Sequence, residues 1–152
     1  MSACLGAQWC ESVRVVEKVA VLDDVRPSRV MVIEEDEAVG TALLRGLLRQ
    51  GWLVVRASTA HAALRLHEEF QPQVVLLALD LPDMTNAALL ARLTQRNDCG
   101  VVALSGQGDH ARHSILALGA HDYMEKPVTL RDLGQRLRAV LLRFGPGSAA
   151  SV

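Results

Sequence analysis

Five consecutive apolar residues, Val74 to Ala78, are followed directly by an acidic loop that contains Pro82. A run this short and this apolar is typical of a strand buried on both faces, as in a parallel sheet with helices on either side. Open parallel sheets bind their ligands just beyond the carboxyl ends of their strands. The residue at that end is Ala78, whose methyl group has no reactive atom, so the centre of the expected site lacks chemistry of its own.

From Arg29 onward, predicted strands and helices alternate along the chain. Each helix has an apolar face at helical spacing, such as Val39, Leu43 and Leu47, and a short loop joins it to the next strand. The strands are predicted at residues 30–33, 52–57, 74–78, 101–104 and 121–124, and the helices carry Leu43, Ala63, Leu90, residues 109–118 and Leu137. This order predicts an α/β fold, a doubly wound five-stranded parallel sheet covered by helices on both faces.

The composition is that of an ordinary globular domain, with 50% hydrophobic and 22% charged residues in a chain of 152. Its net charge of -1 provides no overall field that would draw the chain to nucleic acid or to an anionic membrane. No apolar run approaches the roughly 18 residues of a membrane-spanning helix, and we expect a cytoplasmic protein without membrane contact. Cys4, Cys10 and Cys99 lack CxxC spacing, which favours reduced thiols over a disulfide framework or a zinc site.

Both ends of the chain differ from its regular middle. Residues 1–28 mix helical and alternating periodicity, and we expect them to form an N-terminal extension. Within them, Val21-Leu22-Asp23-Asp24 imitates a strand that ends in paired carboxylates, but Pro27 follows too soon for a helix. Residues 144–152 include Gly-Pro-Gly-Ser, which is typical of a linker or a frayed end. The folded domain is therefore expected at residues 29–143, either as a stand-alone regulator or as part of a longer protein.

Side chains with reactive groups follow three of the predicted strands. Glu34 and Glu35 come after the first strand, Ser105 after the fourth and Lys126 after the fifth. The carboxyl ends of these strands share one crevice in a doubly wound sheet. Paired carboxylates there can hold Mg²⁺, a hydroxyl can donate to an anion, and a lysine supplies positive charge to a phosphoryl or carboxylate group. Each residue alone has an ordinary structural explanation, but the combination at the ends of these strands is a much more specific indication of a functional site. We also expect a cis peptide bond at Lys126-Pro127.

The chain from Arg29 to Arg143 resembles a receiver domain of the two-component response regulators. The motifs that carry this resemblance occur in the family's order and spacing: Val32-Ile33-Glu34-Glu35-Asp36, Leu77-Ala78-Leu79-Asp80-Leu81-Pro82-Asp83-Met84, Ala103-Leu104-Ser105-Gly106 and Gly119-Ala120-His121-Asp122-Tyr123-Met124-Glu125-Lys126-Pro127. The resemblance implies a flavodoxin-like, three-layer α/β/α fold. It also implies that Ser105 follows the phosphoryl group, that Tyr123 swings with it and that Lys126 contacts it.

The sequence departs from the family at the position that matters most. In receivers the third strand ends in an aspartate, four residues before the loop proline, that accepts a phosphoryl group from a histidine kinase. Counting back from Pro82 gives Ala78, which cannot form an acyl phosphate. Asp80 lies two residues too close to Pro82 to replace it. Glu35 stands where the family has an aspartate that ligates magnesium, so Glu34 and Glu35 should bind Mg²⁺ only weakly, and we expect no other cofactor.

We therefore expect an atypical receiver domain, and not an enzyme, that acts in signal transduction or transcription control through protein contacts without phosphorylation. The resemblance places its partner surface, for a kinase, an output domain or a second copy, on the fourth helix, fifth strand and fifth helix, with His113, Tyr123 and Arg131. The arginines of the last helix are expected to be its solvated face, and not a nucleic-acid surface. His110 and His113 lack a third metal ligand.

Two alternatives remain for this chain. It can be a conventional phosphoacceptor receiver in which an engineered alanine replaces the aspartate at position 78, although the glutamate at position 35 favours natural divergence. It can also be a nucleotide- or flavin-binding domain of the flavodoxin-like type. Such domains hold phosphate with a loop rich in glycine or hydroxyl groups, whereas the first loop here is Glu34-Glu35-Asp36-Glu37.

Overall fold

The computed structural model describes residues 27–106 and 109–144 of the chain. The expected N-terminal extension up to residue 26, including the segment 21–24, and the tail from residue 145 lie outside the described residues. Five parallel strands form one sheet in the order β2-β1-β3-β4-β5. Their bounds are β1 Arg29–Ile33, β2 Leu53–Ala57, β3 Val74–Ala78, β4 Gly100–Ser105 and β5 Asp122–Glu125. The sheet is therefore the doubly wound parallel sheet predicted from the sequence.

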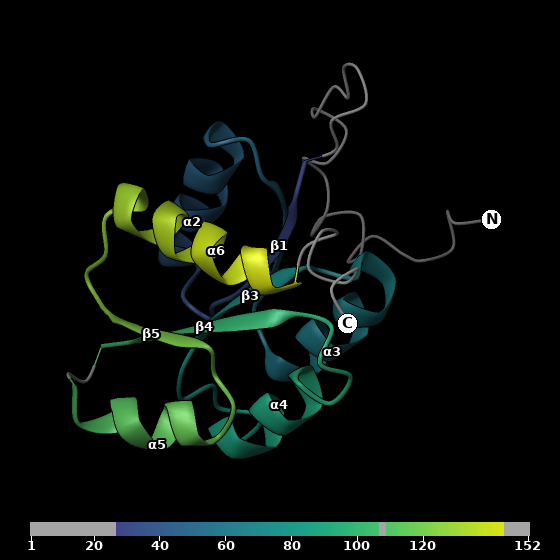
Figure 1. Cartoon of the computed structure of the whole chain (residues 1–152), viewed down its shortest axis with the longest axis vertical. Helices are drawn as coiled ribbons and strands as arrows, with labels where there is room; N and C mark the ends of the chain where they lie inside the picture. Colours follow the sequence, from purple (N-terminus) through teal and green to yellow (C-terminus); the bar gives the residue numbers. More distant parts are fainter. Residues whose placement is uncertain (1–26, 107–108, 145–152) are drawn as a thin grey trace.

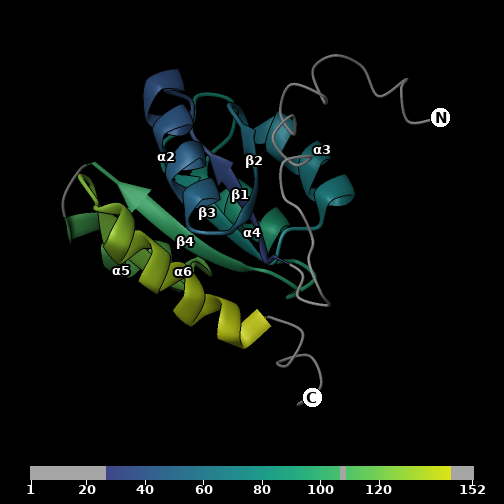
Figure 2. The same cartoon turned by 90° about the horizontal axis from the view of Figure 1, so that it is seen from above.

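Helices cover both faces of this sheet and make a three-layer α/β/α domain. Figure 1 shows α2 and α6 on one face and α3, α4 and α5 on the other, and Figure 2 shows the same layers from above. The helices are α2 Glu37–Arg49, α3 Ala60–Phe70, α4 Asn86–Leu93, α5 Arg112–Ala117 and α6 Leu130–Phe144. Within the described residues, no helix is both long enough and apolar enough to cross a membrane.

Strand β3 lies at the centre of both hydrophobic cores. All of its residues are buried, as the unbroken apolar run predicts. Val75 and Leu77 point into the core under α3, α4 and α5, whereas Val74 and Leu76 point into the core under α2 and α6. Because successive side chains of a strand face opposite ways, this one apolar strand contributes side chains to both cores. Packing on both faces holds β3, and therefore its carboxyl end, in place.

Local signals in the sequence set most of the helix ends. Asp36 caps α2 by accepting a hydrogen bond from the Val39 amide at 3.0 Å, and Thr59 caps α3 by accepting from the Ala62 amide at 3.1 Å. Gly51 follows α2 with a φ of 97°, and Gly119 follows α5 with a φ of 120°. Both values lie in the left-handed region, which glycine adopts without strain from a side chain.

The structure differs from the predicted elements in two details. The helix expected at residues 109–118 begins with a 3-10 turn, η3 Asp109–Ala111, and α5 starts only at Arg112. Ala111, at the cap position of α5, has no side-chain oxygen that could hold an ordinary first turn. At the other end, α6 continues to Phe144, one residue beyond the predicted limit of the domain. The Lys126-Pro127 bond is cis, as expected.

Candidate functional site

The order of the strands places Ala78 between the other site residues. Strand β3 lies between β1 and β4, with Leu77 paired to Ile33 on one side and Ala78 paired to Leu104 on the other. Glu34 directly follows β1, and Ser105 is the last residue of β4. These two residues therefore flank the carboxyl end of β3, as the sequence predicts for the members of one crevice.

Lys126 extends from the end of β5 across the end of β3 to β1. Its backbone amide donates to the Ser105 carbonyl at 2.8 Å, and its Nζ donates to Glu34 Oε1 at 3.0 Å. The Glu34 side chain is only 4% exposed, and that of Lys126 is 34% exposed. An ion pair between residues 92 positions apart thus spans the site above Ala78. The sequence indicated that both residues belong to one site, but not that they bind each other.

The second carboxylate oxygen and the backbone carbonyl of Glu34 also accept hydrogen bonds. Its second carboxylate oxygen, Oε2, accepts from the Asp36 amide at 3.0 Å, and its carbonyl accepts from an Arg56 guanidinium nitrogen at 2.8 Å. The neighbouring Glu35 is exposed. Its side chain thus faces solvent, whereas that of Glu34 faces the crevice.

The magnesium ion implied by the receiver resemblance fits this set of residues poorly. Mg²⁺ requires near-octahedral oxygen ligands, and it is usually held through one or two carboxylates. Ala78 has no side-chain oxygen, and both carboxylate oxygens of Glu34 already accept hydrogen bonds from Lys126 and Asp36. Of the two acidic residues predicted to bind the ion, Glu35 alone has an exposed carboxylate. Weak Mg²⁺ binding by Glu34 and Glu35 stays a prediction.

Ser105 and Tyr123 both point inward. Ser105 is 3% exposed at the end of β4, and Tyr123 is fully buried in β5. The Arg112 guanidinium lies 5.4 Å from the centre of the Tyr123 ring, close enough for a cation–π contact. The expectation that Tyr123 lines a partner surface is therefore wrong for its side chain, because the ring packs into the core under α3, α4 and α5.

Asp80 is held away from the position that an acceptor aspartate would occupy. It has a φ of 66°, and its Oδ1 accepts from the Asn86 side-chain amide at 3.1 Å. In return, the Asp80 amide donates to Asn86 Oδ1 at 2.9 Å. These two bonds hold the exposed Asp80 against the first turn of α4, two residues beyond the end of β3.

The loop after β3 is fastened to the start of α3 by Asp83. Its carboxylate accepts from the backbone amides of Ala60 at 2.9 Å and His61 at 3.0 Å, and it lies 2.7 Å from His61 Nδ1. The hydrogen bonds from the Ala60 and His61 amides lower the pKa of Asp83 to about 2. This contact positions the β3–α4 loop beside the site, although the sequence did not indicate it.

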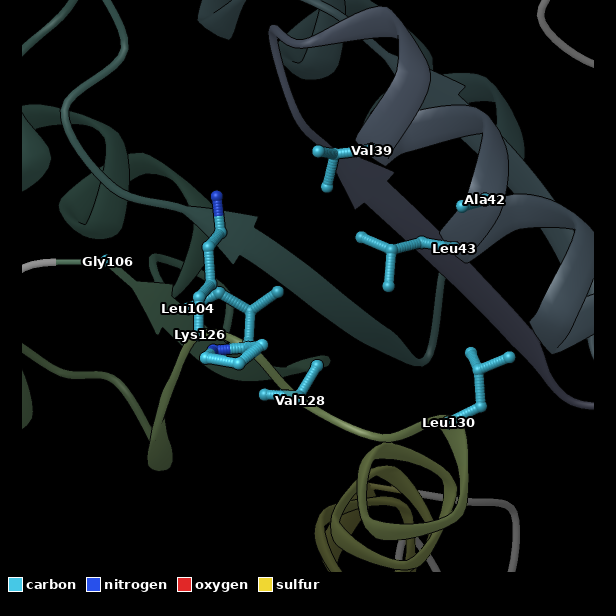
Figure 3. A pocket seen from close by; sticks show the side chains of 9 residues that line it. Val39, Ala42, Leu43, Leu104, Gly106, Lys126, Val128 and Leu130 are labelled. Carbon is cyan, nitrogen blue, oxygen red and sulfur yellow. The ribbon is translucent and has the colours of Figure 1, made fainter.

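An apolar cavity of about 530 Å³ lies beside Lys126. Figure 3 shows Val39 and Leu43 of α2 facing Val128 and Leu130 across it, while the Lys126 amine points away from Val128 and Leu130. The lining residues are Val39, Ala42, Leu43, Leu104, Gly106, Lys126, Pro127, Val128 and Leu130. Val39 is the exposed large hydrophobic residue of this set, at 37%. Among these residues only Lys126 was predicted to belong to a site.

Together, the fold and the crevice define a class of protein. A parallel sheet in the order 2-1-3-4-5, with acidic residues after its first strand, a hydroxyl at the end of its fourth and a lysine after its fifth, is the architecture of a receiver-type signalling domain. The family model of the response regulator receiver domain matches residues 30–138. The chain belongs to this family.

Sequence relatives agree with this assignment. The chain is 36% identical over 115 residues to the transcriptional regulatory protein KdpE of Mycobacterium tuberculosis, covering 75% of this chain and 51% of the relative. It is 34% identical over 114 residues to the transcriptional regulatory protein AfsQ1 of Streptomyces coelicolor, covering 74% of this chain and 51% of the relative. The chain thus spans about half the length of the curated relatives that it matches.

Solved structures show the same fold. A CheY-like response regulator receiver domain protein from Methanospirillum hungatei superposes with a TM-score of 0.72 at 26% identity, covering 78% of this chain and 96% of that one. A response regulator receiver domain protein from Clostridium thermocellum gives a TM-score of 0.69 at 26% identity, covering 76% of this chain and 95% of that one.

Proposed function

We propose that this receiver domain acts without phosphorylation, as a cytoplasmic protein-interaction module in signal transduction or transcription control, and that it is not an enzyme. The observation that carries the proposal is Ala78 at the end of β3 beneath the ion pair of Glu34 and Lys126. An acyl phosphate requires a carboxylate, and alanine offers none. The acidic first loop and the receiver family both weigh against the nucleotide- or flavin-binding alternative.

The ion pair explains how such a domain can stay folded around an unmodified site. The resemblance to receivers implies that this lysine contacts a phosphoryl group, whereas here Lys126 donates to Glu34 at 3.0 Å. A buried carboxylate is costly unless it is paired and hydrogen-bonded, and Glu34 has both kinds of partner. The charges of the site therefore balance within the chain, with neither phosphate nor metal required.

The partner surface is assigned to α5, β5 and α6. His113 and Arg131 are exposed there, and α5 with its C-terminal cap also exposes Leu116 at 37% and Leu118 at 43%. Exposed apolar side chains flanked by charged ones are typical of protein contacts. Because Tyr123 is already buried, this surface does not need a phosphoryl group to set the position of the aromatic ring.

The proposal is tested by incubating the full chain with acetyl phosphate and Mg²⁺ and measuring its intact mass. We expect no phosphoryl adduct, while a phosphoacceptor receiver treated in parallel gains one. A hydroxylamine-sensitive adduct mapped by peptide sequencing to Asp80, or to another carboxylate of the crevice, would show that the domain still accepts phosphate and would refute the proposal.

A further inference from the structure

Three side chains with metal-binding atoms meet near the amino end of β4, at the opposite end of the sheet from Ala78. His67 lies in the last turn of α3, and Asp98 and Cys99 precede β4. The ligand atoms of all three lie within 4.8 Å of one another. His67 Nε2 is 3.4 Å from Cys99 Sγ. This cluster is separate from the crevice around Ala78, so a role for it is independent of the proposed function.

We propose that His67, Asp98 and Cys99 form a zinc site that joins the end of α3 to the loop before β4. Imidazole, carboxylate and thiolate are the ligand types that proteins use for Zn²⁺. Zinc bonds of their usual lengths in a tetrahedron separate sulfur from nitrogen by about 3.5 Å. The observed 3.4 Å between Cys99 Sγ and His67 Nε2 matches that spacing.

The exposure of each ligand fits such a site. Cys99 is fully buried, which fixes the sulfur, whereas Asp98 is exposed, so its carboxylate can rotate to the ion. A polar cavity of about 310 Å³ beside the cluster, lined by His67, Glu68, Arg92 and Arg96 among others, leads to the imidazole. Three protein ligands leave one tetrahedral position for water, which this opening can supply.

The protons on Cys99 and His67 affect the free energy of Zn²⁺ binding, because zinc binds the thiolate and the neutral imidazole. Burial, reinforced by the charge of Asp98, raises the pKa of the Cys99 thiol to about 12, and burial lowers the pKa of His67. The lowered pKa favours the neutral imidazole, the form that binds a metal, whereas the thiol has to lose its proton on binding. Binding forms the zinc–sulfur bond and releases that proton to solvent. One thiolate and one carboxylate then balance the charge of Zn²⁺, although Arg92 and Arg96 nearby reduce the affinity.

No spacing in the sequence indicates this site, because its ligands come from two parts of the chain 32 residues apart. The fold brings them together when α3 packs beside α4 and β4 begins at Gly100. Cys99 also approaches the Leu93 carbonyl at 3.5 Å, so the unbound thiol has a nearby acceptor. The cluster can therefore exist without the ion and does not require it for folding.

The test uses the full chain carrying Cys4→Ser and Cys10→Ser, so that Cys99 is the remaining thiol of the three. This parent is titrated with Co²⁺, a spectroscopic substitute for Zn²⁺. We expect one equivalent to produce thiolate-to-cobalt charge-transfer absorption and the visible bands of a tetrahedral ion. Added Zn²⁺ should abolish both signals and raise the Tm of the parent.

Further variants of this parent assign the ligands. His67→Gln, which leaves the buried sulfur in place, should lose the charge-transfer absorption and the Zn²⁺-dependent rise in Tm, as should Cys99→Ala. Asp98→Asn should lower the Co²⁺ affinity by about tenfold or more. The matched control His113→Gln, at an exposed histidine of α5, should behave as the parent does. No charge-transfer absorption at excess Co²⁺, the same absorption in His67→Gln, or an unchanged affinity in Asp98→Asn would overturn the site.

Discussion

Glu34 and Lys126 stabilise each other across the end of β3. Glu34 is 3% exposed as a residue, so removal of the lysine charge would leave a buried carboxylate without its cation. We predict that Lys126→Met destabilises the domain by about 2–4 kcal/mol. The double variant Glu34→Gln with Lys126→Met should lose much less than the sum of the two single changes, because an amide needs no counter-charge. Urea unfolding of the four proteins measures this, and strictly additive losses would contradict the coupling.

Restoring the acceptor is expected to be insufficient. Ala78→Asp supplies a nucleophile, but Glu35 still replaces the family's magnesium ligand, and its extra methylene moves an oxygen by about 1.5 Å. Misplacement of that size can slow a reaction by about a hundredfold. We therefore predict that Ala78→Asp with Glu35→Asp accepts phosphate from acetyl phosphate much faster than Ala78→Asp alone. Equal rates at saturating Mg²⁺ would identify Glu35 as a competent ligand and favour the engineered-alanine alternative.

The sequence identified the members of the site but not their contacts. Glu34, Ser105 and Lys126 could be predicted as neighbours because each stands at the carboxyl end of a strand in one parallel sheet. Their pairing depends on side-chain direction, which periodicity does not encode. For the same reason Tyr123 was expected at the surface, whereas strand alternation and the position of α5 place its ring in the core.

Helix α3 depends on a residue outside itself. Its own cap, Thr59, bonds one amide, and Asp83 of the β3–α4 loop bonds two more. The anion also lies where the dipole at the start of α3 favours negative charge. A local sequence pattern reveals the first cap, but not the second, because Asp83 lies 22 residues from His61 along the chain.

Asp83 should therefore make stability depend on acidic pH. Its folded pKa of about 2 lies below the ordinary 3.8, so the folded chain binds fewer protons than the unfolded chain between these values. The stabilisation is complete above pH 3.8 and is lost as the pH falls toward 2. We predict that Asp83→Asn lowers the Tm at pH 7 and that the difference from the parent shrinks as the pH falls through this interval. Asp80→Asn, in the same loop, serves as the control, and a pH-independent difference for Asp83→Asn would contradict the linkage.

Most element limits followed from periodicity and from capping residues, and the exceptions have local causes. Unbroken apolar runs located β1, β3 and β4 to within one residue, because buried parallel strands need apolar side chains on both faces. The start of α5 was misplaced because Ala111 gives no capping signal and the 3-10 turn before it has no distinctive sequence.

At the scale of the whole molecule, two different surfaces flank the crevice around Ala78. Helix α2, the segment that leads from β5 into α6 and the end of β4 line the apolar cavity beside Lys126, whereas α5, β5 and α6 present His113, Leu116 and Arg131. In a receiver that phosphate switches, access to a partner depends on modification of the site. Here Tyr123 is already buried against Arg112 without any modification. We therefore expect the surface of α5, β5 and α6 to be available to a partner at all times.

Constitutive association through this surface is the last prediction. If a second copy is the partner, the dimer fraction in sedimentation velocity should rise with concentration and should not respond to acetyl phosphate. The triple variant His113→Ala, Leu116→Ala and Arg131→Ala should lower that fraction, because these exposed side chains can be removed without opening the core. Arg65→Ala with Glu69→Ala, at exposed positions of α3 away from this surface, is the matched control. An unchanged dimer fraction in the triple variant, or the same loss in the control, would place the contact elsewhere, and a chain that stays monomeric throughout would exclude a second copy as the partner.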